Sequence, residues 1–228
     1  MAQSPHTSVP AALLNDADLA HRIAGSDSIA FETLMRRHNG KLFRIARSIL
    51  KDDAEAEDAL QDAYLDAFRH MKSFRGGSQL VTWLTRIVIN QSLMRLRKQR
   101  RHRVVVPFDG RDRAERDRAH AELPDRVTES PASATLRAEV RRMLERRIDE
   151  LPTVFRTVFV MREVNDMSVE ETAACLSIPA ATVRTRLFRA RALLRESVAR
   201  DVDVATGDVF AFAGDRCDRI VAAVLAAI

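Results

Sequence analysis

Arginines gather near the C-terminal end of this 228-residue sequence, in a segment that carries no acid. Five of them lie between positions 184 and 195, and the first acid that follows is Glu196. Like charges three or four residues apart on a helix repel by roughly 0.2–0.5 kcal/mol per pair, so such a helix lacks a counter-charge of its own. Phosphates would supply that charge, and arginine bonds guanine edges bidentately in the major groove. The pattern favours DNA binding over an ordinary solvated helical face.

Two helices joined by a short turn are predicted to present these arginines. Ser168 and Glu171 have the spacing of a capping box, which opens a helix that ends near Leu176. Pro179 is tolerated in the first turn of a helix and therefore marks the start of the next one. The apolar residues of this second helix recur at helical spacing and form its expected buried stripe: Val183, Leu187, Ala190 and Leu194. A three-residue turn before a basic helix indicates a DNA-binding helix-turn-helix.

A second charged feature lies on a helix expected from about residue 53 to 71, which Asp52 would cap. Its acids recur about one turn apart along one side, a set called the acidic stripe below: Glu55, Asp58, Asp62 and Asp66. No Lys or Arg precedes Arg69 in this helix to relieve their repulsion. With Gln61 and Leu65 at its border, the stripe suggests docking to a basic protein helix; a solvated acidic face is the alternative. One convex helix lacks the converging ligands that a metal needs.

A third feature is the segment 74–79, which reads FRGGSQ, and the helix expected after it at about 80–100. Its glycines permit a close approach of backbone to a nucleobase. Polar donors follow at Thr82, Arg86, Asn90 and Arg97, while Leu84, Ile87 and Met94 are expected to face inward. Trp83 has two interpretations, a core residue or a stacking platform for an unpaired base.

These features require a helical framework, and the composition agrees, because Ala, Leu and Arg enter helices at little cost and no segment alternates like a strand. The predicted fold is all-α, with two small helical domains and a flexible linker. The boundaries are a disordered start at 1–14, a first domain at 15–103, a linker at 104–133, a second domain with the helix-turn-helix at 134–200 and an extension helix at 201–228. The linker is rich in charge and proline and too poor in apolar residues to repay its ordering entropy. The apolar stripe of the extension is expected to pack on the second domain or to engage a regulator.

Several classes are disfavoured by composition. The net charge is +5, but positive charge collects at 95–103 and 184–195 while 52–66 is purely acidic, which suggests both a polyanionic and a cationic partner. Cys175 and Cys217 lack metal-ligand spacing and are expected to be small apolar residues in a reducing compartment. With no signal-peptide pattern and no long apolar run, a soluble, cytoplasmic protein without membrane insertion is expected.

The chain resembles the extracytoplasmic-function (ECF) sigma factors, compact bacterial sigma factors with only the second and fourth sigma domains. The motifs that carry the resemblance are DDAEAEDALQD at 52–62, FRG at 74–76, TWLTRIVIN at 82–90, LP at 151–152, EETA at 170–173 and IPAATVRTRLFRAR at 178–191. The resemblance covers about 22–100 and 135–198. It implies a factor that binds RNA polymerase core and directs initiation at promoters, with an anti-sigma factor as a regulatory partner. It implies no catalytic residue, metal or cofactor, because the polymerase performs the phosphoryl transfer.

The resemblance also assigns roles to residues. Docking on the basic coiled coil of the polymerase beta-prime subunit would use Asp58, Gln61, Asp62 and Leu65. Melting and reading the −10 element would use Arg75, Gly76, Gly77, Ser78, Gln79, Trp83, Arg86, Asn90 and Arg97. Contacts to the −35 element would come from Thr182, Arg184, Thr185, Arg186, Phe188, Arg189 and Arg191, while the second domain would also hold the beta-subunit flap.

Two departures and one geometric test accompany the resemblance. The segment 77–81 lacks the acid and serine usual before the Thr-Trp pair, and Ser177 replaces the glycine common in the turn of a helix-turn-helix. A linker of about thirty residues spans up to about 100 Å when extended. Promoter elements two helical turns apart lie about 70 Å from each other, so the linker is long enough.

Two other classes remain as alternatives. A helix-turn-helix regulator that forms no holoenzyme would leave the acidic stripe without a use, and the chain has no ligand-pocket or phospho-acceptor pattern. An enzyme acting on nucleic acid would need converging carboxylates or a zinc motif, whereas the six histidines are scattered and no HxE–CxxC pattern occurs.

Overall fold

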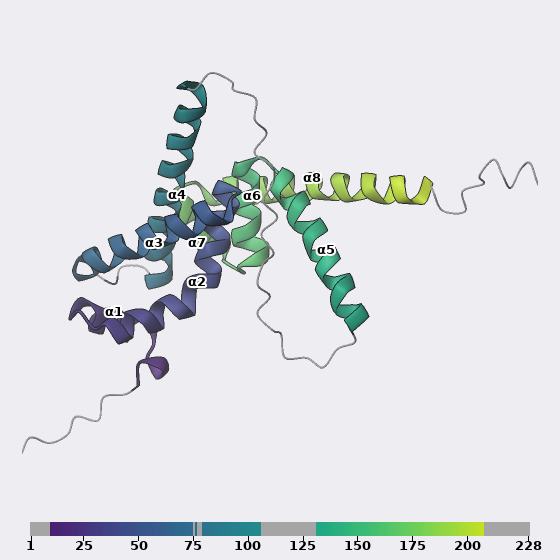
Figure 1. Cartoon of the computed structure of the whole chain (residues 1–228). Coiled ribbons are helices and arrows are strands. Elements are labelled where there is room, and N and C mark those ends of the chain that lie inside the picture. Colours follow the sequence, from purple (N-terminus) through teal and green to yellow (C-terminus); the bar gives the residue numbers. More distant parts are fainter. Residues whose placement is uncertain (1–9, 75, 77–78, 106–130, 208–228) are drawn as a thin grey trace, which may run out of the picture.

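The computed structural model describes residues 10–74, 76, 79–105 and 131–207, and every regular element in these ranges is a helix (Figure 1). The all-α prediction is therefore confirmed. Most of the predicted linker and of the extension helix lies outside the described residues, as do residues 1–9. Within the predicted disordered start, Ala11–Leu13 instead form a short 3-10 helix, η1, whose Ala11 is buried.

The first half of the chain forms α1 (Asp16–Ala24), α2 (Ser28–Leu50), α3 (Asp53–His70), the 3-10 turn η2 (Met71–Ser73) and α4 (Leu80–Val105). Side-chain caps start the first three helices: Asp52, for example, accepts the backbone N–H of Glu55 at 2.9 Å. Helices α2, α3 and α4 pack around a core that includes Leu34, Leu42, Ala59, Ala63, Leu84 and Val88. This core holds the acidic stripe on α3 and the polar donors on α4 in fixed relative positions.

The second half forms α5 (Pro131–Glu150), α6 (Thr153–Phe159), the π-helical turn η3 (Val160–Val164), α7 (Val169–Leu176) and α8 (Ala180–Gly207). The capping box is confirmed, because Glu171 N–H donates to Ser168 Oγ at 3.0 Å and Ser168 N–H donates to Glu171 Oε2 at 2.7 Å. Ser177 ends α7 in the left-handed region with φ 53°. The predicted apolar stripe of α8 is buried at Val183, Leu187 and Ala190 and partly buried at Leu194.

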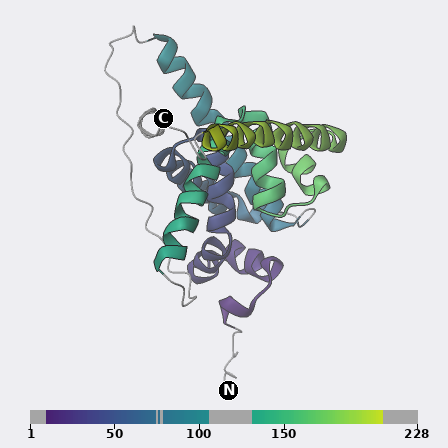
Figure 2. The ribbon, with the colours of Figure 1, turned by 90° about the vertical axis from the view of Figure 1, so that its right-hand side faces the viewer.

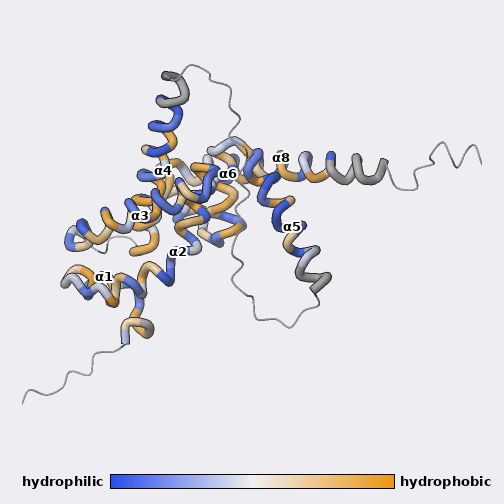
Figure 3. Tube along the Cα trace, viewed as in Figure 1, coloured by the Kyte–Doolittle hydropathy of each residue, from blue (hydrophilic) through white to orange (hydrophobic). Residues whose placement is uncertain are grey.

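The two halves pack against each other, with α2 and α4 on one side and α6, η3 and α7 on the other (Figures 1 and 2). We call this contact the joint. Its apolar centre consists of Ile45, Ile49, Ile89, Met161 and Cys175. The outer end of α4 and the start of α5 project from the packed centre, and Figure 3 shows mainly hydrophilic residues along the projecting part of α4.

Two side chains bear on the sequence predictions for the core. Cys175 is buried in the joint, where its thiol donates to the Thr82 carbonyl at 3.8 Å and burial raises its pKa to about 11, so it is a small interior residue as predicted. Cys217 lies outside the described residues. The inward placement of Met94 is wrong, since its side chain is 51% exposed. Met94 lies about 80° around the helix from the buried Leu84, which turns it off the core-facing side.

Candidate protein and nucleic-acid interfaces

The outer face of α3 carries the acidic stripe in an accessible position. The side chains of Asp58 and Asp62 are 59% and 49% exposed, and Leu65 is 56% exposed. Gln61 is exposed on the same side of the helix. The four residues predicted to dock on polymerase thus share one side of α3, and the packing of the other helices leaves that side open, with the apolar Leu65 at its border.

Arg95 of α4 lies against this surface, a contact that the sequence analysis missed. Its Nη2 donates to Asp62 Oδ2 at 2.6 Å, and its Nη1 lies 3.2 Å from Glu55 Oε2 and 3.4 Å from Asp58 Oδ2. The repulsion along the acidic stripe is therefore relieved by a residue 33 positions away from Asp62 in sequence. No periodicity within α3 signals this contact, because it depends on how α3 packs against α4.

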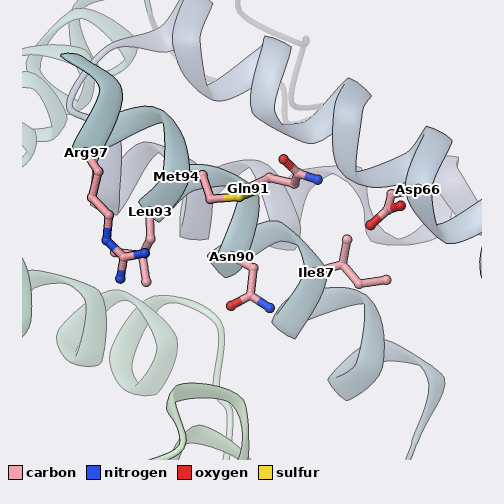
Figure 4. A pocket seen from close by; sticks show the side chains of 7 residues that line it. All are labelled: Asp66, Ile87, Asn90, Gln91, Leu93, Met94 and Arg97. Carbon is pink, nitrogen blue, oxygen red and sulfur yellow. The ribbon is translucent and has the colours of Figure 1, made fainter. Parts of the chain in front are cut away.

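Asp66, the last acid of the stripe, has a different environment. Its carboxylate lies 3.1 Å from Nδ1 of His70, one turn later on α3. It also borders a groove of about 400 Å³ between α3 and α4, lined otherwise by Ile87, Asn90, Gln91, Leu93, Met94 and Arg97 of α4 (Figure 4). The exposed Met94 belongs to this groove and not to the core.

The residues predicted for the −10 element lie in the segment before α4 and along α4 as far as Arg97. Arg75, Gly77 and Ser78 lie outside the described residues, whereas Gly76 is exposed at φ 69° and a Cβ built there would meet no atom within 4 Å. Gln79 is exposed, as are three donors farther along α4: Arg86, Asn90 and Arg97. The predicted donor Thr82 is buried beneath α7, so its side chain is not available on this surface.

Trp83 is partly a core residue and partly exposed, so its position agrees in part with each of its two interpretations, core residue and stacking platform. Its side chain is half-buried, packs against the first core and lies with its ring centroid 5.4 Å from that of Phe74. Phe74 follows η2 and is the first residue of the segment 74–79 with its two glycines, called the glycine segment below, so the aromatic contact joins the beginning of that segment to the start of α4. The residue supports the local structure and still presents part of its surface to solvent.

The residues predicted for the −35 element lie on the exposed side of α8, opposite its buried stripe. Phe188 is 71% exposed, and Arg184, Thr185, Arg189 and Arg191 are exposed, while Thr182 and Arg186 are partly exposed. Two of these arginines have acidic neighbours from other elements: Arg191 pairs with Glu163 of η3 at 2.8 Å, and Arg184 lies 3.8 Å from Glu170 of α7. Within the described part of the chain, Arg186 and Arg189 form no ion pair.

The described residues also bear on metal binding and on membrane crossing. Among the described residues, no group of three or more His, Cys, Asp and Glu side chains is arranged to hold a metal ion. Within the same ranges, every helix lacks the length or the apolar run that crossing a membrane requires.

Comparison with known proteins identifies both halves of the chain. Residues 34–102 match the family described as Sigma-70 region 2, and residues 141–194 match Sigma-70, region 4. The first match contains the acidic stripe and most of the described part of α4, and the second contains the capping box and the arginines Arg184 to Arg191.

Relatives agree with these matches over most of the chain. The RNA polymerase sigma-H factor of Pseudomonas aeruginosa is 34% identical over 77% of this chain and 90% of its own length. The ECF RNA polymerase sigma-E factor of Escherichia coli is 31% identical over 81% of this chain and 95% of its own length. The ECF sigma factor SigM of Mycobacterium tuberculosis is 34% identical over 79% of this chain and 83% of its own length.

A solved structure supports the same relationship. CnrH, determined in complex with the cytosolic domain of CnrY, superposes with a TM-score of 0.58 at 25% identity and covers 82% of this chain and 98% of its own. The Bartonella quintana sigma factor RpoE, solved with the anti-sigma factor NepR, has the same fold, with a TM-score of 0.56 at 22% identity over 74% of this chain and 96% of its own. The chain therefore belongs to the sigma-70 family, in its extracytoplasmic-function group, and is a sigma factor that directs promoter-specific transcription.

Proposed function

We propose that this sigma factor docks on RNA polymerase core through α3 and positions it on promoters through two DNA-binding surfaces, one at the start of α4 and one on α8. The observation that carries the proposal is the presence, in one chain, of an exposed acidic stripe and a separate exposed arginine face with few internal counter-charges. A DNA-binding regulator that forms no holoenzyme needs only the second of these surfaces.

Docking on core would use Asp58, Gln61, Asp62 and Leu65 against the basic coiled coil of the beta-prime subunit. Their common exposure on one side of α3 supports this role. Charge complementarity between an acidic helix and a basic one accelerates association and fixes register, and an apolar residue at the edge adds buried area. The second half of the chain would hold the flap of the beta subunit.

Recognition of the −10 element would involve the glycine segment and the start of α4. Gln79, Arg86, Asn90 and Arg97 offer exposed donors, and Gly76 leaves space for a close approach of backbone to a base. The exposed part of Trp83 would stack on a base at the edge of the melted region. Arg75, Gly77 and Ser78 would complete the surface.

Recognition of the −35 element would involve the outer side of α8 in the major groove. Arg186 and Arg189 are the clearest candidates, because within the described residues neither is engaged in an ion pair. Arginine reads guanine through two parallel hydrogen bonds, and an apolar side chain such as Phe188 contacts the thymine methyl group. Thr182, Arg184, Thr185 and Arg191 would flank these contacts.

Simultaneous use of both DNA surfaces would require the joint to open. In the structure α7 packs on α4, so the two DNA-facing helices belong to one packed body. Promoter elements about 70 Å apart cannot be contacted from adjacent helices, whereas a linker of about thirty residues allows the halves to separate that far. The Bartonella protein was solved with the anti-sigma factor NepR. An anti-sigma factor of this chain would act by keeping it from polymerase core.

The decisive experiment adds the full chain to sigma-free polymerase core and maps transcripts from genomic DNA. We expect specific starts that depend on the chain; failure to bind core would contradict the proposal and favour the regulator. Replacing Asp58 and Asp62 together by Lys should weaken core binding. The matched control replaces Asp18 of α1 and Glu145 of α5, two exposed acids on other helices, by Lys and should bind core normally.

A further inference from the structure

Arg95 pairs with the same carboxylates of the acidic stripe that a basic partner would bind. Its two terminal nitrogens reach Asp62, Glu55 and Asp58 at 2.6, 3.2 and 3.4 Å, so one guanidinium serves three of the four acids of the stripe. The Arg95 side chain is 26% exposed, less than any of these three carboxylates, which are 36–59% exposed. The guanidinium thus lies beside the acids, at the edge of the proposed docking surface that borders α4.

The charge balance of the surface follows from this placement. One positive charge faces three negative ones, which leaves the docking surface acidic but less so than the sequence of α3 alone indicates. A Lys or Arg of the partner would approach carboxylate oxygens that already accept hydrogen bonds from Arg95, and the positive charge of Arg95 beside them would repel it. Partly exposed charges interact through a medium of high effective dielectric, so the effect is modest in size and sensitive to salt.

Arg95 differs from Lys98, a neighbouring cation of α4. Lys98, one turn later and exposed, forms no ion pair with any described residue. Burial lowers the pKa of Arg95, but its hydrogen bonds to Asp62 and Glu55 outweigh that effect and raise the pKa above its ordinary value, so the guanidinium remains charged. A permanent cation at this point acts on the docking surface at every physiological pH.

We propose that Arg95 is an internal counter-ion of the docking surface, which limits the affinity for polymerase core and reduces the salt dependence of binding. The inference rests on the proposed docking through α3. A residue that merely ties α4 to α3 makes the opposite prediction, because its removal would disorder the surface and weaken binding.

The test measures equilibrium binding of the fluorescently labelled full chain to sigma-free core polymerase at several salt concentrations. Arg95→Met should bind core about two- to five-fold more tightly at low salt, with a steeper loss of affinity as salt rises. Lys98→Met makes the same change in net charge without touching the acids and should leave the affinity close to that of the parent. Arg95→Lys keeps the charge, but its single ammonium group cannot reach three carboxylates at once. Its affinity for core should therefore lie between those of the parent and Arg95→Met.

The outcomes separate the two proposals. If the parent chain binds no core, docking through α3 itself fails. If the parent binds but Arg95→Met and Lys98→Met behave alike, or Arg95→Met binds more weakly, the counter-ion role is wrong. Thermal unfolding of each variant shows whether it is folded. If Arg95→Met is unfolded, the core affinity of Arg95→Lys is compared with that of the parent instead. An unchanged or lower affinity of Arg95→Lys overturns the inference.

Discussion

Arginines of the joint and arginines of α8 differ in whether their charge is satisfied within the described part of the chain. In the joint, Arg156 of α6 is fully buried and donates to the carbonyl oxygens of Ser48, Leu151 and Asp149. Next to the joint, Arg47 of α2 forms a two-pronged pair with Asp149 of α5 at 2.7 and 3.0 Å. On α8, Arg189 is exposed and forms no ion pair within the described ranges. The comparison shows that the number of arginines is less informative than whether the chain itself satisfies them.

The difference has a simple physical basis. A buried guanidinium loses its hydration and must find an acceptor for each donor, or it destabilises the fold. Burial lowers the pKa of Arg156 to about 10, with Asp149 opposing and Arg47 reinforcing the shift, so the group is still charged at neutral pH. An exposed arginine keeps its water and can exchange it for phosphate or guanine. The first kind holds the two halves together, and the second kind is available to a partner.

Substitution of the buried arginine in the joint is expected to have the largest effect, a loss of stability. Arg156→Met would leave the carbonyls of Ser48 and Leu151 buried without donors, and we expect a loss of about 3 kcal/mol in the free energy of unfolding. Urea unfolding followed by circular dichroism measures it. A loss below about 1 kcal/mol would show that water or neighbouring groups replace the guanidinium and would remove the contrast with α8.

Substitution of an exposed arginine on α8 is expected to have an intermediate effect, a loss of DNA affinity. Arg189→Ala should weaken binding of the holoenzyme to its −35 element by about 1–3 kcal/mol while stability changes by less than about 0.5 kcal/mol. Competition binding with promoter and scrambled DNA measures the first quantity, and the unfolding assay measures the second. An equal loss on both DNA sequences would identify a phosphate contact, and a large loss of stability would make Arg189 a structural residue like Arg156.

The turn before α8 offers the smallest effect. Ser177 lies at φ 53°, where glycine is less strained, so Ser177→Gly should raise the free energy of unfolding by about 0.5 kcal/mol and leave DNA affinity unchanged. Thermal unfolding and promoter binding provide the two readings. If DNA affinity changed instead, the conformation of the turn would be tuned for recognition rather than merely tolerated.

The sequence alone determined the features that depend on neighbours within about one helical turn. Caps at Asp52 and Ser168 and the buried spacing of Val183 and Leu187 follow from local stereochemistry. The same local spacing predicted the shared face of the acidic stripe, and the motifs identified the family.

The tertiary structure alone decided which charges are satisfied. Arg44 meets Asn165 across 121 positions, Arg156 meets Ser48 across 108 and Arg95 meets Asp62 across 33. Such pairs depend on the angle and register at which helices pack, and helical periodicity carries no information about either. The sequence therefore predicted where charge lies along each helix. Only the packing showed that Arg95 and Arg156 are engaged within the chain, and that Arg189 forms no ion pair with any residue that the structure describes.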